Sequence, residues 1–302
     1  MLASLGTLAF GADSQLTLTY LGTAGWQITD GTILILVDPY LSRLPLLPDA
    51  SSLTQAENAG RPPVDQSLVV RPDTAPVDAH VQHADFILLT HSHVDHILDA
   101  PNIALKTGAT VIGHESAINI MRGSGVLPSK LITVRGGEDY TFGSFSVRIV
   151  PSIHSALFNK HYFQSGIIPP SVQPPFKLGD LIEGGNLAYL IRIAGHQILA
   201  FGSMNYIERE VAGLRPDVVL MGAGESRKEI YDYAGRLMRA LGFPAIVLPT
   251  HWDNYMVPFD APQDKNIAAL QTFVREVHSA SPNTAVIIPK YFDPIAIPPH
   301  RR

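Results

Sequence analysis

The chain has 302 residues and a formal net charge of −5; 46% of the residues are hydrophobic, 16% are charged and none is cysteine. This length suffices for a large core, in one domain or in two fused halves. The acidic balance argues against a nucleic-acid partner, and the lack of cysteine excludes disulfides, thiolate chemistry and cysteine-based zinc sites.

Residues 1–12 at the N-terminus are mostly small or apolar, and this stretch ends in Ala9-Phe10-Gly11-Ala12. This composition suits the remnant of a secretory signal, but no Lys or Arg precedes the apolar run. Residues 1–15 are therefore expected to be either a signal remnant, in a periplasmic or secreted protein, or a plain extension of a cytoplasmic one. No other run is apolar and long enough for an integral membrane segment, and no pattern indicates an oligomeric state.

The first structured elements are predicted to form a β-meander. Residues 16–21 alternate as a strand does, Asp30-Gly31 is a strong hairpin turn, and residues 32–37 are β-branched and apolar. Residues 41–80 carry six prolines and no periodicity, so we expect a loop excursion near a site.

The remaining pattern alternates strands with helices. Strands are expected at 85–90, 110–112, 131–134, 145–150, 186–193, 197–201, 217–221, 245–248 and 285–288, and helices at 100–107, 115–122, 206–213, 228–241 and 263–278. Gly242 is placed to cap the fourth of these helices. The segment 155–184 combines prolines with aromatic residues, which suits either a lid or substrate wall or an ordinary surface loop.

The chemistry is concentrated in Thr90-His91-Ser92-His93-Val94-Asp95-His96, which follows the apolar strand at 85–90. Four strong metal-ligating side chains fall within six residues, at the end of a strand, where open α/β sheets place their sites. Imidazole and carboxylate together suit Zn, Mn or Fe better than Ca or Mg. The motif therefore predicts a metal site.

This string resembles the signature of the metallo-β-lactamase superfamily. The resemblance implies an α/β fold, a four-layer αββα sandwich, in a single hydrolase domain over residues 16–302. It also implies two metal positions. The first would be held by His91, His93 and His154, and the second by Asp95, His96 and His251; His154 and His251 each follow a predicted strand.

One position departs from the family pattern. The family expects Gly-Asp after the strand at 197–201, and this chain has Gly202-Ser203. Two cations about 3.5–4 Å apart repel each other, and a shared carboxylate normally offsets that repulsion. With Ser203 in its place, a water or hydroxide bridges alone, only one position fills well, or Asn205 or Glu225 moves in.

Further segments narrow the resemblance. Gly22-Thr23-Ala24-Gly25-Trp26, the segment 37–41 and Pro249-Thr250-His251-Trp252 look like the branch that holds ascorbate-6-phosphate lactonases and N-acyl-phosphatidylethanolamine phospholipase D. The likeness runs over residues 16–288. It suggests the branch and does not fix the substrate.

The expected activity is metal-dependent hydrolysis. A bound metal lowers the pKa of water from 15.7 toward about 7, which gives hydroxide at neutral pH. Asp95 is the candidate catalytic residue because it can orient this nucleophile or accept its proton. Zn is the expected metal, as one or two ions, with Mn or Fe as alternatives.

The substrate is expected to be a small molecule, apolar or amphipathic, such as a lactone or ester. A phosphodiester, as in a phospholipase D, is the alternative, with Arg227 and Lys228 as the nearest phosphate-binding cations. A metal-binding protein whose catalysis is weakened by Ser203 is the other alternative.

Two further groups of residues need assignment. Asp38 either orients a ligand histidine or belongs to an Asp-Pro turn. The remaining histidines lack the context of the motif and are mostly expected at the surface; they are His80, His83, His114, His161, His196, His278 and His300.

Overall fold

Alternating apolar side chains build two seven-stranded sheets in the computed structural model, which describes residues 15–46, 64–155, 160, 162 and 164–299. The expectations for residues 1–12, His161 and His300 lie outside these residues. The first sheet has the order β14-β1-β2-β3-β4-β5-β6. Its strands are β1 (Thr17–Gly22), β2 (Gly25–Thr29), β3 (Leu34–Val37), β4 (Phe86–Leu89), β5 (Thr110–Gly113), β6 (Leu131–Thr133) and β14 (Pro294–Ala296).

The second sheet has the order β13-β12-β11-β10-β9-β8-β7. Its strands are β7 (Asp139–Phe142), β8 (Phe145–Pro151), β9 (Leu187–Ile193), β10 (His196–Phe201), β11 (Val218–Gly222), β12 (Ile246–Thr250) and β13 (Ala285–Val286). Each sheet is mixed, with parallel strands β3 to β6 in the first and β10 to β13 in the second.

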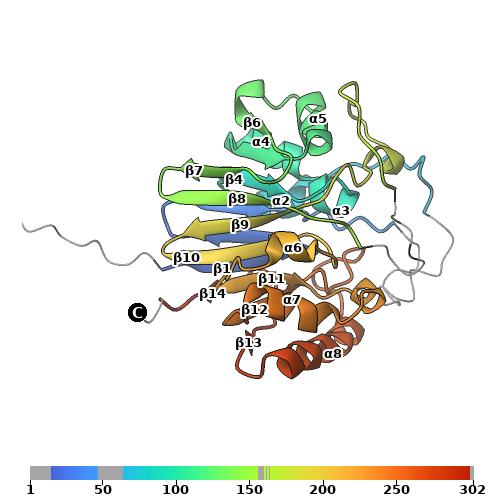
Figure 1. Ribbon diagram of the computed structural model, residues 1–302. Coiled ribbons are helices and arrows are strands. Elements are labelled where there is room, and N and C mark those ends of the chain that lie inside the picture. The colour runs from blue at the N-terminus through green and yellow to red at the C-terminus, as the bar shows by residue number, and fades with distance from the viewer. Residues whose placement is uncertain (1–14, 47–63, 156–159, 161, 163, 300–302) are drawn as a thin grey trace, which may run out of the picture.

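Helices complete the outer layers, and in Figure 1 α4 and α5 lie at one end of the molecule and α7 and α8 at the other. The helices are α2 (Thr74–His80), α3 (Val94–Ile97), α4 (Ala100–Thr107), α5 (Glu115–Gly123), α6 (Glu208–Val211), α7 (Tyr233–Leu241) and α8 (Asp264–Ala280). Short 3-10 turns occupy Pro128–Lys130, Leu178–Asp180 and Glu225–Glu229. None of the helices in the described part of the chain is long and apolar enough to cross a membrane.

The two faces of the first sheet bury side chains in two separate cores. Val37 and Leu88 point into the core shared with the second sheet, whereas their neighbours Leu36, Ile87 and Leu89 pack in the core beneath helices α2 to α5. Successive residues of a strand point to opposite faces, so a strand buried on both sides must be apolar throughout. This confirms the four-layer αββα sandwich expected from the sequence.

Several sequence expectations need correction. The segment 41–80 is not all loop, since α2 forms within it with Asp73 as its N-cap. The edge strands β7 and β14 were not predicted, because their pairing with β8 and β1 depends on distant residues. Helix α7 begins at Tyr233, five residues later than expected, and α6 is shorter than expected. Gly242 does cap α7, with φ of 75°.

The topology places the functional loops together. Antiparallel β9 lies between β8 and β10, so these two strands run in the same direction. The carboxyl ends of β3 and β4 in one sheet therefore meet those of β8, β10 and β12 in the other, as the geometry of the next section shows. The irregular segments before α2 and before β9 also pair with each other. The Val70 N–H donates to the Phe176 carbonyl at 2.9 Å, and the Leu178 N–H donates to the Leu68 carbonyl at 2.8 Å.

A buried tyrosine joins the two sheets directly below the metal motif. The hydroxyl of Tyr189 on β9 lies 2.7 Å from the Leu89 carbonyl oxygen and 3.2 Å from that of Ile112. Replacing Tyr189 with Phe should lower the free energy of unfolding by about 1–2 kcal/mol, because a buried hydrogen bond is lost without a cavity. Urea denaturation measures this, with the exposed Tyr140→Phe as the control. Equal losses in the two variants would contradict the assignment.

Candidate metal centre

The loop after β4 is held in place by Asp38, which follows β3. Its carboxylate accepts the Thr90 backbone N–H at 2.7 Å and also the Thr90 hydroxyl. The next turn of chain becomes helix α3, which begins at Val94 and carries Asp95 and His96. This arrangement turns the motif back over the ends of the strands. Asp38 itself, in the loop after β3, has a left-handed φ of 39°, a conformation that aspartate tolerates better than most residues.

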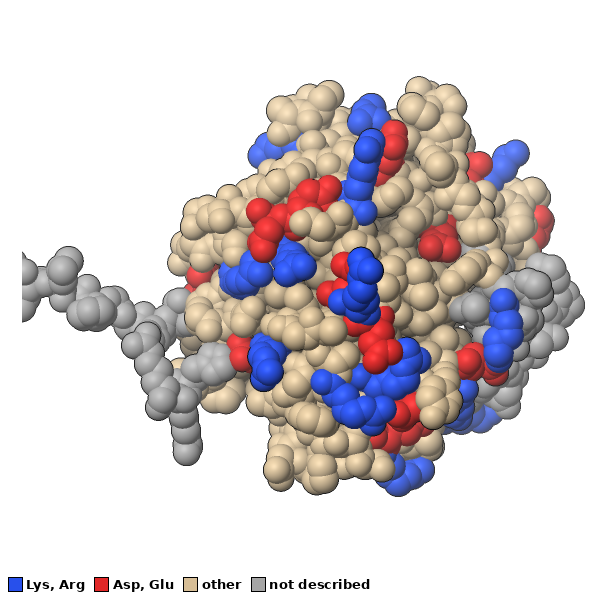
Figure 2. Space-filling view, in the orientation of Figure 1, with Lys and Arg blue, Asp and Glu red and all other residues tan. Residues whose placement is uncertain are grey.

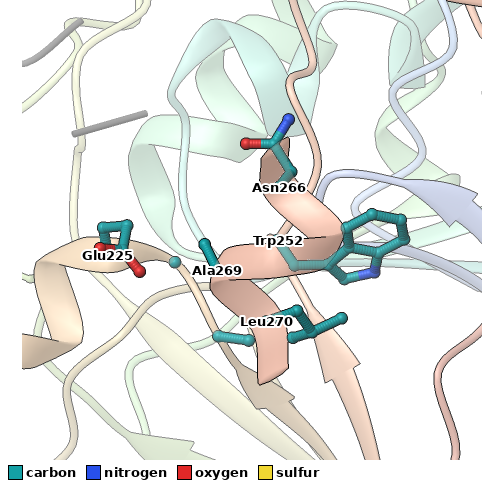
Figure 3. Close-up of a pocket in the computed structure, with 7 residues that line it drawn as sticks. Glu225, Trp252, Asn266, Ala269 and Leu270 are labelled. Atoms are coloured by element: carbon teal, nitrogen blue, oxygen red, sulfur yellow. The ribbon is translucent and has the colours of Figure 1, made fainter. Parts of the chain in front are cut away.

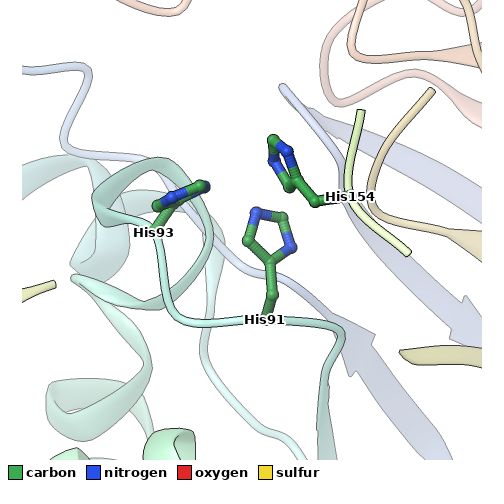
Figure 4. Close-up of side chains that lie close together, drawn as sticks. All are labelled: His91, His93 and His154. Atoms are coloured by element: carbon green, nitrogen blue, oxygen red, sulfur yellow. The ribbon is translucent and has the colours of Figure 1, made fainter. Parts of the chain in front are cut away.

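His91, His93 and His154 converge, as Figure 4 shows. Their ring centroids lie 4.9, 4.9 and 4.8 Å apart in pairs, and all three residues are buried. One nitrogen from each lies within 4.8 Å of the other two. We call these residues the three-histidine group. His154 reaches it from the loop after β8, as its position after a predicted strand indicated.

Asp95, His96 and His251 form the adjoining Asp95 group. Oδ2 of Asp95 lies 3.6 Å from Nε2 of His96 and 3.3 Å from Nε2 of His251. The rings of His91 and His96 are only 3.8 Å apart, so the two groups are neighbours. The structure thus brings together all six residues that the sequence singled out.

Hydrogen bonds fix the orientation of the rings. The Thr90 hydroxyl gives its only proton to Asp38, so its oxygen accepts from Nδ1 of His91 at 3.1 Å. Nδ1 of His154 donates to the Ser155 carbonyl at 2.8 Å, and Nδ1 of His96 lies 2.8 Å from Asp38 Oδ2. In its neutral form each ring therefore presents the lone pair of Nε2. The role of Thr90 was missed in the sequence, although it lies within the motif.

Electrostatics favours the metal-binding protonation states of His91, His154 and Asp95. Burial, reinforced by His96 and His154, holds the pKa of His91 well below its usual value. Burial and the nearby His93 lower the pKa of His154 to about 3. Burial opposes the charged form of Asp95, but His96 and His251 outweigh it and lower its pKa. Neutral imidazoles beside an ionised carboxylate are the forms that bind a divalent cation. At His96 burial opposes the charged form, but Asp95 and Asp38 outweigh it and raise the pKa, so a metal must displace a proton there.

A metal ion fits these residues. Nε2 of His91 is buried and meets no hydrogen-bond partner among the described residues, which is costly for a polar atom unless something else binds it. Three imidazoles, or two with a carboxylate, are donor sets typical of Zn and of other transition metals. Asp38 already accepts three hydrogen bonds, one of them from the ring of His96. It therefore orients this histidine and does not contact a metal itself, which is the first of the two roles considered for it from the sequence.

The residues considered as substitutes for the bridging carboxylate are engaged elsewhere. The Ser203 hydroxyl accepts the Ser155 N–H at 3.0 Å and so supports the loop of His154. Asn205 bonds the His154 carbonyl at 3.3 Å and its own neighbour Tyr206. Glu225 pairs with Arg227 at 3.2 Å and with Lys228. Gly202 admits no side chain, because a Cβ would lie 1.9 Å from the Thr90 hydroxyl.

A small pocket lies next to the loop that carries His251 (Figure 3). Its lining is mostly apolar, with Glu225 and Asn266 as the polar members and Trp252, Ala223, Gly224, Ala269 and Leu270 as the others. The buried Arg227 donates to the carbonyls of the lining residues Ala223 and Gly224 and pairs with Glu276 at 2.8 Å.

The surrounding histidines are more varied than expected. His196 is buried at the start of β10 and is an exception to the expectation that these histidines lie mostly at the surface. His114 is half-buried. Neither belongs to the metal-ligating groups found among the described residues.

The depressed pKa of His154 predicts a pH dependence for the metal-free protein. Below its usual pKa of 6.5 the unfolded chain takes up a proton here that the folded chain does not take up until about pH 3. Stability present above pH 6.5 is therefore lost as the pH falls, by up to about 2 kcal/mol at about pH 5. His154→Gln should flatten the profile of urea midpoints measured in chelator, whereas the exposed His278→Gln should not. Parallel profiles for the wild type and His154→Gln would refute this.

Comparison with known proteins agrees with the geometry. Residues 17–251 match the family model of the beta-lactamase superfamily domain. A UPF0173 metal-dependent hydrolase from Thermoplasma volcanium is 26% identical over 227 residues, which cover 74% of this chain and 86% of the relative. One from Staphylococcus aureus is 30% identical over 181 residues, covering 59% of this chain and 72% of the relative.

Among solved structures, Igni18, a metallo hydrolase from Ignicoccus hospitalis, aligns with a TM-score of 0.59 and 16% identity over 95% of this chain and all of the other. This similarity establishes the fold. Together with the family match over most of the chain and the clustered histidines, it shows that the chain belongs to the beta-lactamase superfamily and is a metal-dependent hydrolase with the metallo-β-lactamase fold.

Proposed function

We propose that this hydrolase cleaves a small uncharged ester or lactone at a metal centre formed by the three-histidine group and the Asp95 group. The supporting observation is the convergence of His91, His93 and His154, buried and with the proton placed on Nδ1 of His91 and of His154. Zn is the proposed metal because its usual ligands match this set; Mn or Fe is the alternative. The resemblance to the lactonase branch supports the same choice of substrate.

The bound metal would supply a Lewis acid that activates water and stabilises the oxyanion of the transition state. The chain's own residues provide the orientation. Asp95 is held as an anion by His96 and His251, so its carboxylate can accept a hydrogen bond from the attacking water and receive its proton. The neutral rings of His91 and His154 add no positive charge that would compete with metal binding.

The charges near the pocket favour an uncharged substrate over a phosphodiester. Arg227 and Lys228, the nearest cations by sequence, both pair with Glu225, and Arg227 is buried. The residues that line the pocket include Glu225 and no Lys or Arg, so they offer a phosphate no opposite charge. On the face shown in Figure 2, acidic and basic side chains are interspersed. Phosphodiester hydrolysis remains the second candidate, and a weakened metal-binding protein the third.

Metal content and turnover test the proposal together. Protein purified without added metal should contain about two metal ions per chain by plasma mass spectrometry if water bridges the positions in place of the missing carboxylate. It should hydrolyse a p-nitrophenyl ester or a lactone faster than bis(p-nitrophenyl) phosphate, with activity removed by chelator and restored by Zn or Mn. Activity on the phosphodiester alone would favour the second candidate. Bound metal without turnover would favour the third.

The hydrogen bond from His96 to Asp38 predicts an effect on metal affinity. Asp38→Asn keeps the shape but removes the charge that fixes the His96 tautomer, so affinity should fall about 10–100-fold. Calorimetric titration of stripped protein with Zn²⁺ measures this. Asp30→Asn is the matched control, because that carboxylate also accepts two backbone N–H groups, at 2.8 and 2.9 Å, but lies in the β2–β3 hairpin. Unchanged affinity in Asp38→Asn would exclude the orienting role.

A further inference from the structure

A second buried network lies behind the Asp95 group, on the side of His251. Its centre is Arg43, in the loop after β3, which is only 4% exposed. The guanidinium reaches the loop after β12 with three separate donors. Nη1 lies 2.8 Å from Asp253 Oδ2, while Nη2 donates to the Asn254 carbonyl and Nε to that of Val257. One side chain thus holds three points of the loop that follows His251.

Asp253 extends the network to β1 and to the chain before β14. Its Oδ1 accepts the Tyr20 hydroxyl at 2.8 Å and the Thr23 N–H at 2.9 Å, and its Oδ2 accepts the Tyr291 hydroxyl at 2.8 Å. A fully buried carboxylate normally carries a large desolvation cost, and these donors together with Arg43 compensate it. Asp253 therefore fixes the position of Thr23 relative to the loop after β12.

Thr23 in turn fixes His251. The His251 backbone N–H donates to the Thr23 carbonyl at 2.5 Å, and the Thr250 hydroxyl donates to the same oxygen at 3.0 Å. Both His251 and Thr23 have φ of 55°, a left-handed conformation that is uncommon outside glycine and that a β-branched residue such as Thr23 rarely adopts. Such a backbone persists only where the surrounding contacts determine it, and here those contacts come from Asp253 and Arg43.

The packing around Arg43 leaves little freedom. The guanidinium carbon lies 4.5 Å from the Phe259 ring centroid and 5.2 Å from that of Tyr291. A Cβ at Gly22 would lie 2.7 Å from Arg43 Nη1, so only glycine lets the guanidinium pass. A planar donor in a closed slot suits arginine, and lysine could satisfy only part of it.

We propose that Arg43 and Asp253 are positioning residues that hold His251 toward Asp95 and so set the metal affinity of the Asp95 group, without affecting the three-histidine group. This rests on the proposed function, in which Asp95, His96 and His251 bind the second metal. The role of Arg43 is distinct from that of Asp38, which orients His96 within the same group.

The test is a calorimetric Zn²⁺ titration of chelator-stripped protein, in which the wild type should show two binding events. His251→Ala identifies the event that belongs to the Asp95 group. Arg43→Lys, which keeps the charge but not the planar fork, should weaken that event about tenfold or more and leave the other unchanged. Tyr291→Phe, which removes one hydrogen bond to Asp253 and no charge, should weaken the same event less.

Arg227→Lys is the matched control, because Arg227 is an equally buried arginine that pins a different loop to α8. It should leave both binding events unchanged even if it costs stability. The inference would be overturned if Arg43→Lys weakened both events equally. It would also be overturned if Arg43→Lys and Tyr291→Phe left the event lost in His251→Ala unchanged, or if Arg227→Lys caused the same change as Arg43→Lys. A wild type with no binding event would overturn the proposed metal centre itself, whereas one event unaffected by His251→Ala would remove only the second position and this inference with it.

Discussion

The hydrogen bonds of the Asp38 carboxylate are the interaction on which the rest of this centre depends. Asp38 follows β3. Its carboxylate accepts the backbone N–H of Thr90, which follows β4, and lies 2.8 Å from Nδ1 of His96 on α3. A single buried anion therefore joins two parallel strands and a helix. It also orients His91 indirectly, since the Thr90 hydroxyl that donates to Asp38 accepts from that ring. Removing this anion would release both groups of ligands at once.

The second sheet reaches this anion through close backbone approach. Gly202 follows β10, and a Cβ there would lie 2.8 Å from Asp38 Oδ2 as well as against Thr90. The glycine thus lets the loop after β10 close over the loop after β4. Ser203 can then support His154 through the Ser155 N–H. In this chain Ser203, at the expected carboxylate position, has a structural hydrogen bond. In the proposed metal centre, Asp95 would therefore be the carboxylate that offsets the charge of the metal.

Two aspartates flank the Asp95 group in complementary ways. Asp38 acts on a side chain, because it fixes the ring of His96. Asp253 acts on the backbone, because with Arg43 it maintains the left-handed conformations of Thr23 and His251. Strained backbone conformations persist only where the surrounding contacts determine them, and the buried carboxylates of Asp38 and Asp253 both have their hydrogen-bond partners here. Rigid support of this kind keeps ligand atoms in place before a metal arrives.

The two-sheet architecture and the six clustered residues were both predictable from the sequence and from the resemblance that it carries. Period-two alternation and apolar runs located the longer strands, and helix α4 was predicted at its observed bounds. His91, His93, Asp95 and His96 lie within six residues, and the resemblance to the superfamily added His154 and His251, each of which follows a strand. Tertiary structure alone decided α2, β7 and β14, the burial of His196, and the partners of Asp38, Ser203 and Arg43. Each of these depends on contacts between distant segments, such as Arg43 with Asp253, and no local period or turn signal encodes which donor a buried carboxylate will meet.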